Sequence, residues 1–166
     1  MSVILRFLDP SAGTYTADDA NLLKVGPEDL AGTVAWCPQE AHVFNSSLRA
    51  NLLIARDRDD RPGDDELLEV LRRVGLDELA RERGLDAVIG AGGEFLSGGQ
   101  RGRLAIARTL LTGADVIVID EPTAHLDVET AQALMADLRE TLDDRAVVMV
   151  THDQRWVSAD DLRVKL

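Results

Sequence analysis

The last third of the chain alternates between short apolar runs and one long amphipathic stretch. Val116–Ile119 and Ala146–Val150 are apolar runs rich in β-branched residues, which are typical of strands buried on both faces of a parallel sheet. Between them, apolar residues recur at helical spacing from Val128 to Leu142, directly after Asp127, a residue type that caps helix N-termini. This strand–helix–strand order predicts a parallel sheet with a right-handed crossover.

The middle of the chain is predicted to be largely helical. Arg56–Asp65 contains eight charged residues among ten, which indicates a loop. Asp64 and Asp65 can then cap a helix whose apolar residues follow helical spacing as far as Gly75, and a shorter helix is expected at Asp77–Arg83. We therefore expect residues 45–112 to form a helical subdomain.

The first 44 residues give weaker signals. Gly13–Thr16 and Asn21–Val25 are short candidate strands, and Pro27–Leu30 predicts one helical turn that begins with proline. Thr33–Cys37 is a plausible buried strand, closed by Pro38. The expected fold is thus α/β, with a parallel-sheet core built from residues 1–44 and 113–166 and the helical subdomain inserted between them.

Composition narrows the possible functions. The 166 residues correspond to about one domain. Acidic residues outnumber basic ones by 30 to 18, and the net charge of −12 repels phosphate backbones, so no nucleic-acid partner is expected. No apolar run approaches the ~20 residues of a membrane span, and Met1–Leu8 is a poor signal peptide, so a soluble piece is expected. The single Cys37 excludes an internal disulfide and a cysteine-built metal cluster.

Polar side chains follow three of the predicted strands. Asp120 and Glu121 directly follow one apolar run, His152 follows the next, and Gln39 lies beyond the strand near Cys37. Ligands of parallel sheets bind beyond the carboxyl ends of the strands, and successive strand residues point to opposite sides, so the two acids can hold different roles. Asp120 can support Mg²⁺, and Glu121 can orient or deprotonate a water. Each signal alone also fits solvated acids, a structural histidine or a solvated glutamine.

A glycine-containing segment begins another predicted helix, which runs to about Thr112. Ser97 and Gln100 have capping-box spacing, and Gly98 and Gly99 leave backbone N–H groups open to close approach. Free amides at the positive end of a helix dipole form a phosphate site. An ordinary capped helix with a flexible entry is the alternative.

Together these segments resemble the ATPase domain of ATP-binding-cassette (ABC) proteins, which has a P-loop NTPase-like, RecA-like core. The resemblance covers nearly the whole chain. It equates Gln39 with the Q-loop, residues 96–100 (LSGGQ) with the signature motif, and residues 120–121 with the Walker B aspartate and catalytic glutamate. It equates Asp127 with the D-loop and His152 with the switch histidine.

The resemblance implies ATP and Mg²⁺ as cofactors, sandwiched between this domain and a second ABC ATPase domain. Glu121 and His152 would hold the attacking water, with Mg²⁺ on Asp120 and Gln39. Ser97, Gly98, Gly99, Gln100 and Asp127 would contact nucleotide across the dimer.

Two departures from the family pattern are visible. No G-x-x-x-x-G-K-[ST] phosphate loop occurs, and Leu5–Pro10 resembles the end of the helix that follows this loop. The chain is therefore expected to begin just after the loop and to be inactive alone. The second departure is Ala124-His125, where the family often has Ser-Ala.

Residues 38–52 resemble exporters in which a transmembrane domain precedes the ATPase domain on one chain, most closely a subunit of the heterodimeric cysteine/glutathione exporters of cytochrome bd assembly. This implies a transmembrane-domain partner at the cytoplasmic face of the bacterial inner membrane. Two alternatives stay open: a non-catalytic module that completes a partner's ATP site, and a soluble ABC protein without a transport role.

Overall fold

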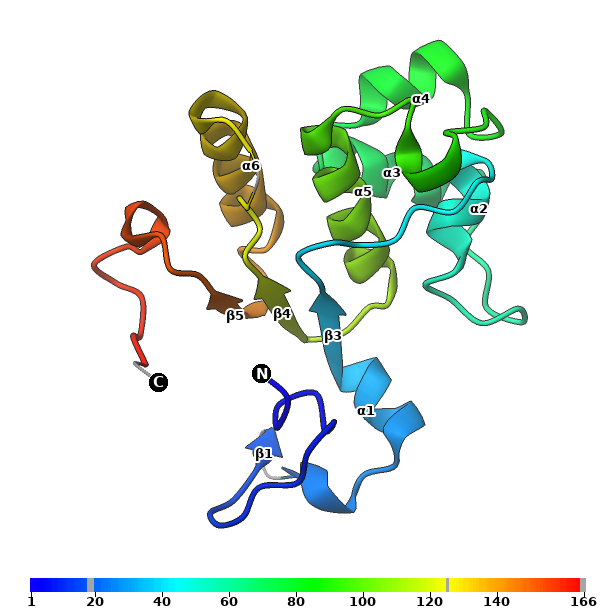
Figure 1. The fold of residues 1–166 in the computed structure, drawn as a ribbon. Coiled ribbons are helices and arrows are strands. Elements are labelled where there is room, and N and C mark those ends of the chain that lie inside the picture. Colours follow the sequence, from blue (N-terminus) through cyan, green and yellow to red (C-terminus); the bar gives the residue numbers. More distant parts are fainter. Residues whose placement is uncertain (18–19, 125, 165–166) are drawn as a thin grey trace.

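The computed structural model describes residues 1–17, 20–124 and 126–164 as a mixed α/β fold (Figure 1). Three parallel strands form its central sheet, and a two-stranded antiparallel ribbon lies near the N-terminus. The strands are β1 (Thr16–Ala17), β2 (Ala20–Asn21), β3 (Val34–Cys37), β4 (Val116–Asp120) and β5 (Ala146–Val150). The α-helices are α1 (Pro27–Thr33), α2 (Leu48–Leu53), α3 (Asp64–Arg73), α4 (Asp77–Arg83), α5 (Gly98–Leu111) and α6 (Val128–Thr141). Short 3₁₀ helices are η1 (Leu22–Lys24), η2 (Ala91–Gly93) and η3 (Gln154–Trp156).

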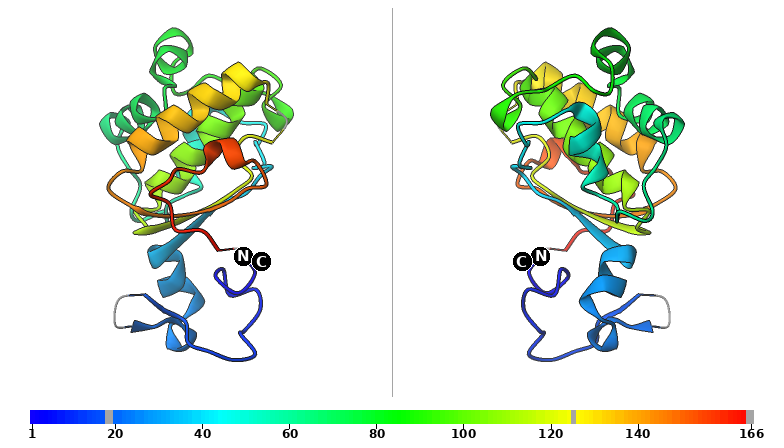
Figure 2. Two further views of the ribbon diagram at one scale, coloured as in Figure 1. Left: turned by 90° about the vertical axis from the view of Figure 1, so that its left-hand side faces the viewer. Right: turned by 90° about the vertical axis from the view of Figure 1, so that its right-hand side faces the viewer.

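The central sheet has the order β3-β4-β5, with β4 in the middle. Helices α5 and α6 lie on one side of the sheet and the N-terminal segment lies on the other (Figure 2). Successive residues of β4 serve these two sides in turn: Ile117 and Ile119 belong to the helical core, whereas Val118 packs with Leu22 and Leu30. The continuous apolar run of β4 therefore exists because both faces of the strand are covered.

Helix α5 is the central helix of the larger core. It contacts α2, α3, α6 and β3. Leu104 of α5 is fully buried, as are Leu67 and Leu71 of α3 and Leu52 of α2. A single apolar cluster thus joins the helices of residues 45–112 to one face of the sheet.

A buried amide ties the loop after β3 to the helices. Asn51 is completely buried, and its side chain bonds both the N–H and the carbonyl of Phe44, at 2.9 and 3.0 Å. Arg108 of α5 donates from Nε to the Asn51 carbonyl at 2.7 Å and also bonds the carbonyl of His42. A buried polar group without a partner costs about 1–3 kcal/mol, so moving residues 42–51 away from α5 would break these bonds at that cost. The network therefore holds residues 42–51 against α5.

Most predicted elements are confirmed. The sheet is parallel, and α4 and β5 have the expected bounds, while α3, α5, α6, β3 and β4 differ by a few residues at their ends. The helix from Ser97 begins with the predicted capping box.

Four local predictions are wrong. The strand expected at Gly13–Thr16 lies at Thr16–Ala17 instead. The strand expected at Asn21–Val25 does not continue past Asn21, because the Asn21 side chain accepts a hydrogen bond from the Leu23 N–H and starts the 3₁₀ helix η1. Helix α3 is capped by Gly63 without a side-chain bond, since Asp64 instead pairs with Arg49. Residues 1–8 form turns rather than the end of a helix.

Two leucines of α3 test the helical core. Leu71 is fully buried, whereas Leu68 on the same helix is 43% exposed. Leu71→Ala is expected to lower the free energy of unfolding by about 2–5 kcal/mol, because it removes a buried side chain and leaves a cavity. Leu68→Ala is the matched control and should cost less than about 1 kcal/mol. Equal losses in urea denaturation would contradict this packing.

Candidate active site

The carboxyl ends of the three parallel strands lie at one edge of the sheet. The register pairs Cys37 with Ile119 and Asp120 with Val150. Gln39 therefore follows β3 at the same edge at which Asp120 ends β4. Glu121 and His152 continue from β4 and β5 at this edge. Parallel pairing thus gathers the polar residues from three distant parts of the sequence.

Glu121 directly follows β4 and leaves its extended conformation. Its φ of 43° lies in the left-handed region, which is uncommon for a residue other than glycine. The Glu121 N–H donates to the Val150 carbonyl at 2.9 Å, and this bond holds the turn. Asp120 is the last residue of β4, so the alternation of side chains along a strand does not extend to Glu121.

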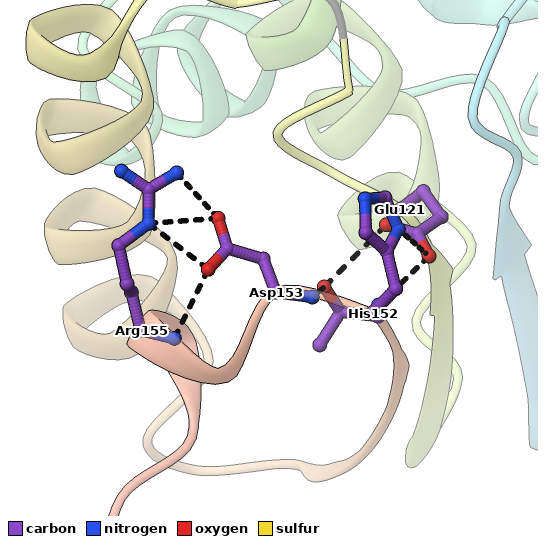
Figure 3. A network of polar contacts seen from close by, with 5 residues as sticks. Glu121, His152, Asp153 and Arg155 are labelled. Atoms are coloured by element: carbon purple, nitrogen blue, oxygen red, sulfur yellow. Dashed lines mark hydrogen bonds and ion pairs between the residues drawn. The ribbon is translucent and has the colours of Figure 1, made fainter.

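Glu121 and His152 are in direct contact (Figure 3). One carboxylate oxygen, Oε1, lies 3.0 Å from the His152 backbone N and 2.8 Å from its ring Nδ1. The Glu121 side chain is only 18% exposed, whereas that of His152 is 85% exposed. The hydrogen bond to the carboxylate, followed by the attraction of its charge, raises the pKa of His152.

Asp120 and Gln39 lie at neighbouring strand ends. Asp120 is half-buried and Gln39 is exposed, and within residues 1–17, 20–124 and 126–164 neither side chain has a hydrogen-bond partner. No group of three or more His, Cys, Asp or Glu side chains that could hold a metal occurs in these ranges. Mg²⁺ often takes one or two protein oxygens and completes its shell with waters and phosphate, so one carboxylate beside one amide fits this ion.

The N-terminus of α5 carries the glycine-containing segment. Ser97 Oγ accepts from the Gln100 N–H at 3.1 Å, and Gln100 Oε1 accepts from the Ser97 N–H at 2.8 Å. Gly98 is partly exposed, but Gly99 is buried, and a Cβ at Gly99 would lie 2.9 Å from Thr130 Cγ2. Gly99 is thus required for the close approach of α5 to α6, in addition to any contact with a ligand.

Asp127 caps the adjacent helix α6. Its carboxylate accepts from the Thr130 N–H at 3.0 Å and from the Thr130 hydroxyl at 2.7 Å. These bonds lower the pKa of Asp127, and the bond from the Thr130 backbone N–H has the largest effect. Asp127 therefore has a structural role in this chain alone. The neighbouring departure at His125 lies outside the described residues.

The predicted residues form two separate groups. Glu121 and His152 touch, with Asp120 and Gln39 at the same sheet edge, whereas the residues from Ser97 to Gln100 lie at the start of α5. Across the described part of the chain, no hydrogen bond joins the two groups.

No role was predicted from the sequence for Thr151, Arg155 and Trp156, which lie around His152. The Thr151 hydroxyl bonds the second oxygen of Glu121. Asp153 pairs with Arg155 through several hydrogen bonds (Figure 3). Trp156 is buried and anchors this segment. The hydroxyl of Thr151, directly before the histidine and after an apolar run, is the signal that could have indicated its role.

The sequence model of the ABC transporter family matches residues 1–124. The chain belongs to the ABC transporter family. It is 40% identical over 157 residues to the glutathione/L-cysteine transport system ATP-binding/permease protein CydC of Escherichia coli, covering 93% of this chain and 26% of that protein.

Other ABC proteins are also similar. An ATP-dependent lipid A-core flippase of Chromobacterium violaceum is 35% identical, over 91% of this chain and 26% of the flippase. A solved bacterial Atm1-family ABC exporter with ATP bound has a TM-score of 0.78 and 26% identity, over 93% of this chain and 27% of the exporter chain. The chain thus spans about a quarter of the length of these ABC relatives. Among its described helices, none is long and apolar enough to cross a membrane.

The Glu121–His152 contact of this ABC domain can be tested by pH. Since the negative carboxylate raises the pKa of His152 above 6.5, Glu121→Gln should move it down toward 6.5. The stabilising effect of this contact is fully present below the ordinary pKa of histidine, and it is lost as the pH rises through the folded-state value. An NMR titration of the His152 ring measures both values. Glu66→Gln, in the first turn of α3, is the control and should change nothing; an unchanged His152 pKa in Glu121→Gln would exclude the contact.

Proposed function

We propose that this chain forms part of the ATP-hydrolysing domain of an ABC exporter, and that hydrolysis drives transport through a membrane domain. The observation that carries the proposal is the Glu121–His152 contact at the mouth of a parallel sheet, beside Asp120, in a chain of this family. Glu121 is the general base that orients and deprotonates a water, and His152 holds the carboxylate and contacts the phosphate.

The Mg²⁺ ion is assigned to Asp120 and Gln39. Their free oxygens at adjacent strand ends support this assignment, because Mg²⁺ prefers oxygen ligands and retains waters. The bound ion would supply charge neutralisation for the phosphates of ATP. The sequence contains no G-x-x-x-x-G-K-[ST] loop, so the proposal assigns the cradle of the β- and γ-phosphates to residues outside these 166.

A second ATPase domain is the proposed partner of the segment from Ser97 to Gln100. Ser97 is exposed, and the start of α5 offers amides and the positive end of a dipole. In the described structure it has no hydrogen bond to the strand-end group, which favours a nucleotide held by the other domain. We keep Asp127 in the same interface, where its exposed carboxylate follows the loop after Glu121.

A transmembrane domain is the other proposed partner. The CydC relative is named as an ATP-binding/permease protein, and the chain covers about a quarter of its length. A groove of about 300 Å³ lies between the β3 end and helices α2 and α5, and its rim carries the exposed apolar side chains of Trp36, Phe44 and Ile54. Exposed apolar surface of this kind is typical of a protein-binding site, so we assign the groove to the membrane domain of the same protein.

This assembly places the domain at the cytoplasmic face of the bacterial inner membrane. The division into a core of residues 1–44 and 113–166 and a helical subdomain of residues 45–112 belongs to the same proposal. The parallel strands lie in the first part and α2–α5 in the second, which supports the division. The groove then lies at the boundary between the two parts.

Glu121→Gln tests the catalytic assignment in a longer protein that carries the phosphate loop. The amide keeps the shape of the side chain but cannot take the proton. ATP should therefore stay bound while the hydrolysis rate falls by about 10²- to 10⁴-fold. Glu129→Gln, an exposed acid in the first turn of α6, is the matched control and should keep the normal rate. A normal phosphate-release rate in Glu121→Gln would show that Glu121 is not the base.

Ser97→Arg tests the crosswise arrangement. The added bulk should weaken ATP-driven dimerisation by about tenfold or more and lower hydrolysis at the partner's phosphate loop. ATP binding to the subunit's own loop should change little. Ser97→Ala removes the same cap without adding bulk, and it separates the loss of about 1 kcal/mol of helix stability from the block of the interface. Loss of ATP binding by a folded, monomeric Ser97→Arg domain would refute the assignment.

A further inference from the structure

The two carboxylate oxygens of Glu121 have different hydrogen-bond partners. Oε1 faces two groups of His152, its backbone N at 3.0 Å and ring Nδ1 at 2.8 Å. Oε2 accepts one bond, from the Thr151 hydroxyl at 3.4 Å. Because a carboxylate oxygen offers about two lone pairs, Oε1 is filled when Nδ1 carries a proton, whereas Oε2 keeps one acceptor direction.

The direction of the Thr151 hydroxyl is set by its other partner. Thr151 Oγ1 accepts a hydrogen bond from the Asp153 N–H at 3.1 Å. A hydroxyl has one proton to donate, and an amide donor on the oxygen directs that proton elsewhere. The acceptor in reach is Glu121 Oε2, so the hydroxyl donates to the carboxylate.

The segment after His152 is rigidly anchored. Asp153 accepts bonds from the Arg155 backbone N at 3.1 Å and from its Nε at 2.9 Å. Trp156 is buried, with 9% of its surface exposed, and its carbonyl accepts a hydrogen bond from Arg139 of α6 at 2.7 Å. Thr151 is therefore held between β5 on one side and this anchored turn on the other, which restricts where its hydroxyl can point.

We propose that Thr151 is a positioning residue, whose hydroxyl fixes the rotation of the Glu121 carboxylate so that Oε2 keeps its open acceptor direction for a substrate water. His152 holds one oxygen of the Glu121 carboxylate, which leaves the plane of the carboxylate free to turn about that contact. The bond from the Thr151 hydroxyl to the other oxygen restricts this rotation. This role rests on the proposed function of Glu121 as the base.

A double-mutant cycle in the 166-residue chain tests the contact without ATP. Thr151→Val is nearly isosteric and removes the hydroxyl, and Glu121→Ala removes its acceptor. Thr151→Val should increase the unfolding equilibrium constant about three- to tenfold more in the wild-type background than in Glu121→Ala. The lost bond from the Asp153 N–H is common to both backgrounds and cancels. Thr151→Ser keeps the hydroxyl and should restore the coupling; equal effects of Thr151→Val in both backgrounds overturn the proposal.

The hydrolysis rate of a longer protein carrying the phosphate loop tests the consequence. Thr151→Val should lower kcat about tenfold with the KM for ATP unchanged, and Thr151→Ser should stay within about twofold of wild type. Full kcat in Thr151→Val, in a protein that Glu121→Gln inactivates, overturns the positioning role alone. Full kcat in Glu121→Gln overturns the proposed function together with the use of Oε2.

Discussion

Parallel pairing around β4 is the constraint on which the rest of the structure depends. A parallel strand needs cover on both faces, and β4 has the helical core on the side of Ile117 and Ile119 and the N-terminal segment on the side of Val118. The same pairing brings the ends of β3, β4 and β5 level. Folding the apolar cores and assembling the polar edge are therefore one event, because the strand register determines both.

The sequence allowed prediction of the elements whose signals are local. Residue spacing over a short stretch of sequence is enough to predict the bounds of α4 and β5 and the capping box at Ser97. The strand prediction for Asn21–Val25 is wrong because the Asn21 side chain caps the Leu23 N–H, and this local bond competes with strand pairing. The outcome of that competition cannot be predicted from so short a segment. The cap of α3 at Gly63 was not predicted, because Asp64 forms a salt bridge with Arg49, fifteen residues away in the sequence.

The candidate site divides in the same way. That Asp120, Glu121 and His152 lie at one edge could be inferred from the order of apolar runs alone. The contact of Glu121 with His152 could not, since it depends on the left-handed turn at Glu121 and on a bond to Val150. The double role of Gly99, as a neighbour of the capping box and as the point where α5 meets Thr130, likewise appears only when α6 is in place.

Helix α5 connects the hydrogen-bond network around Asn51 to the capping box at Ser97. Arg108, near one end of this helix, donates hydrogen bonds to the carbonyl of His42, in the loop that follows Gln39, and to the carbonyl of Asn51, in α2. Ser97 lies at the other end, about 16 Å away along a helix rising 1.5 Å per residue. Because Arg108 belongs to the helix that Ser97 caps, the loop after β3 and the exposed start of α5 are joined through one continuous helix.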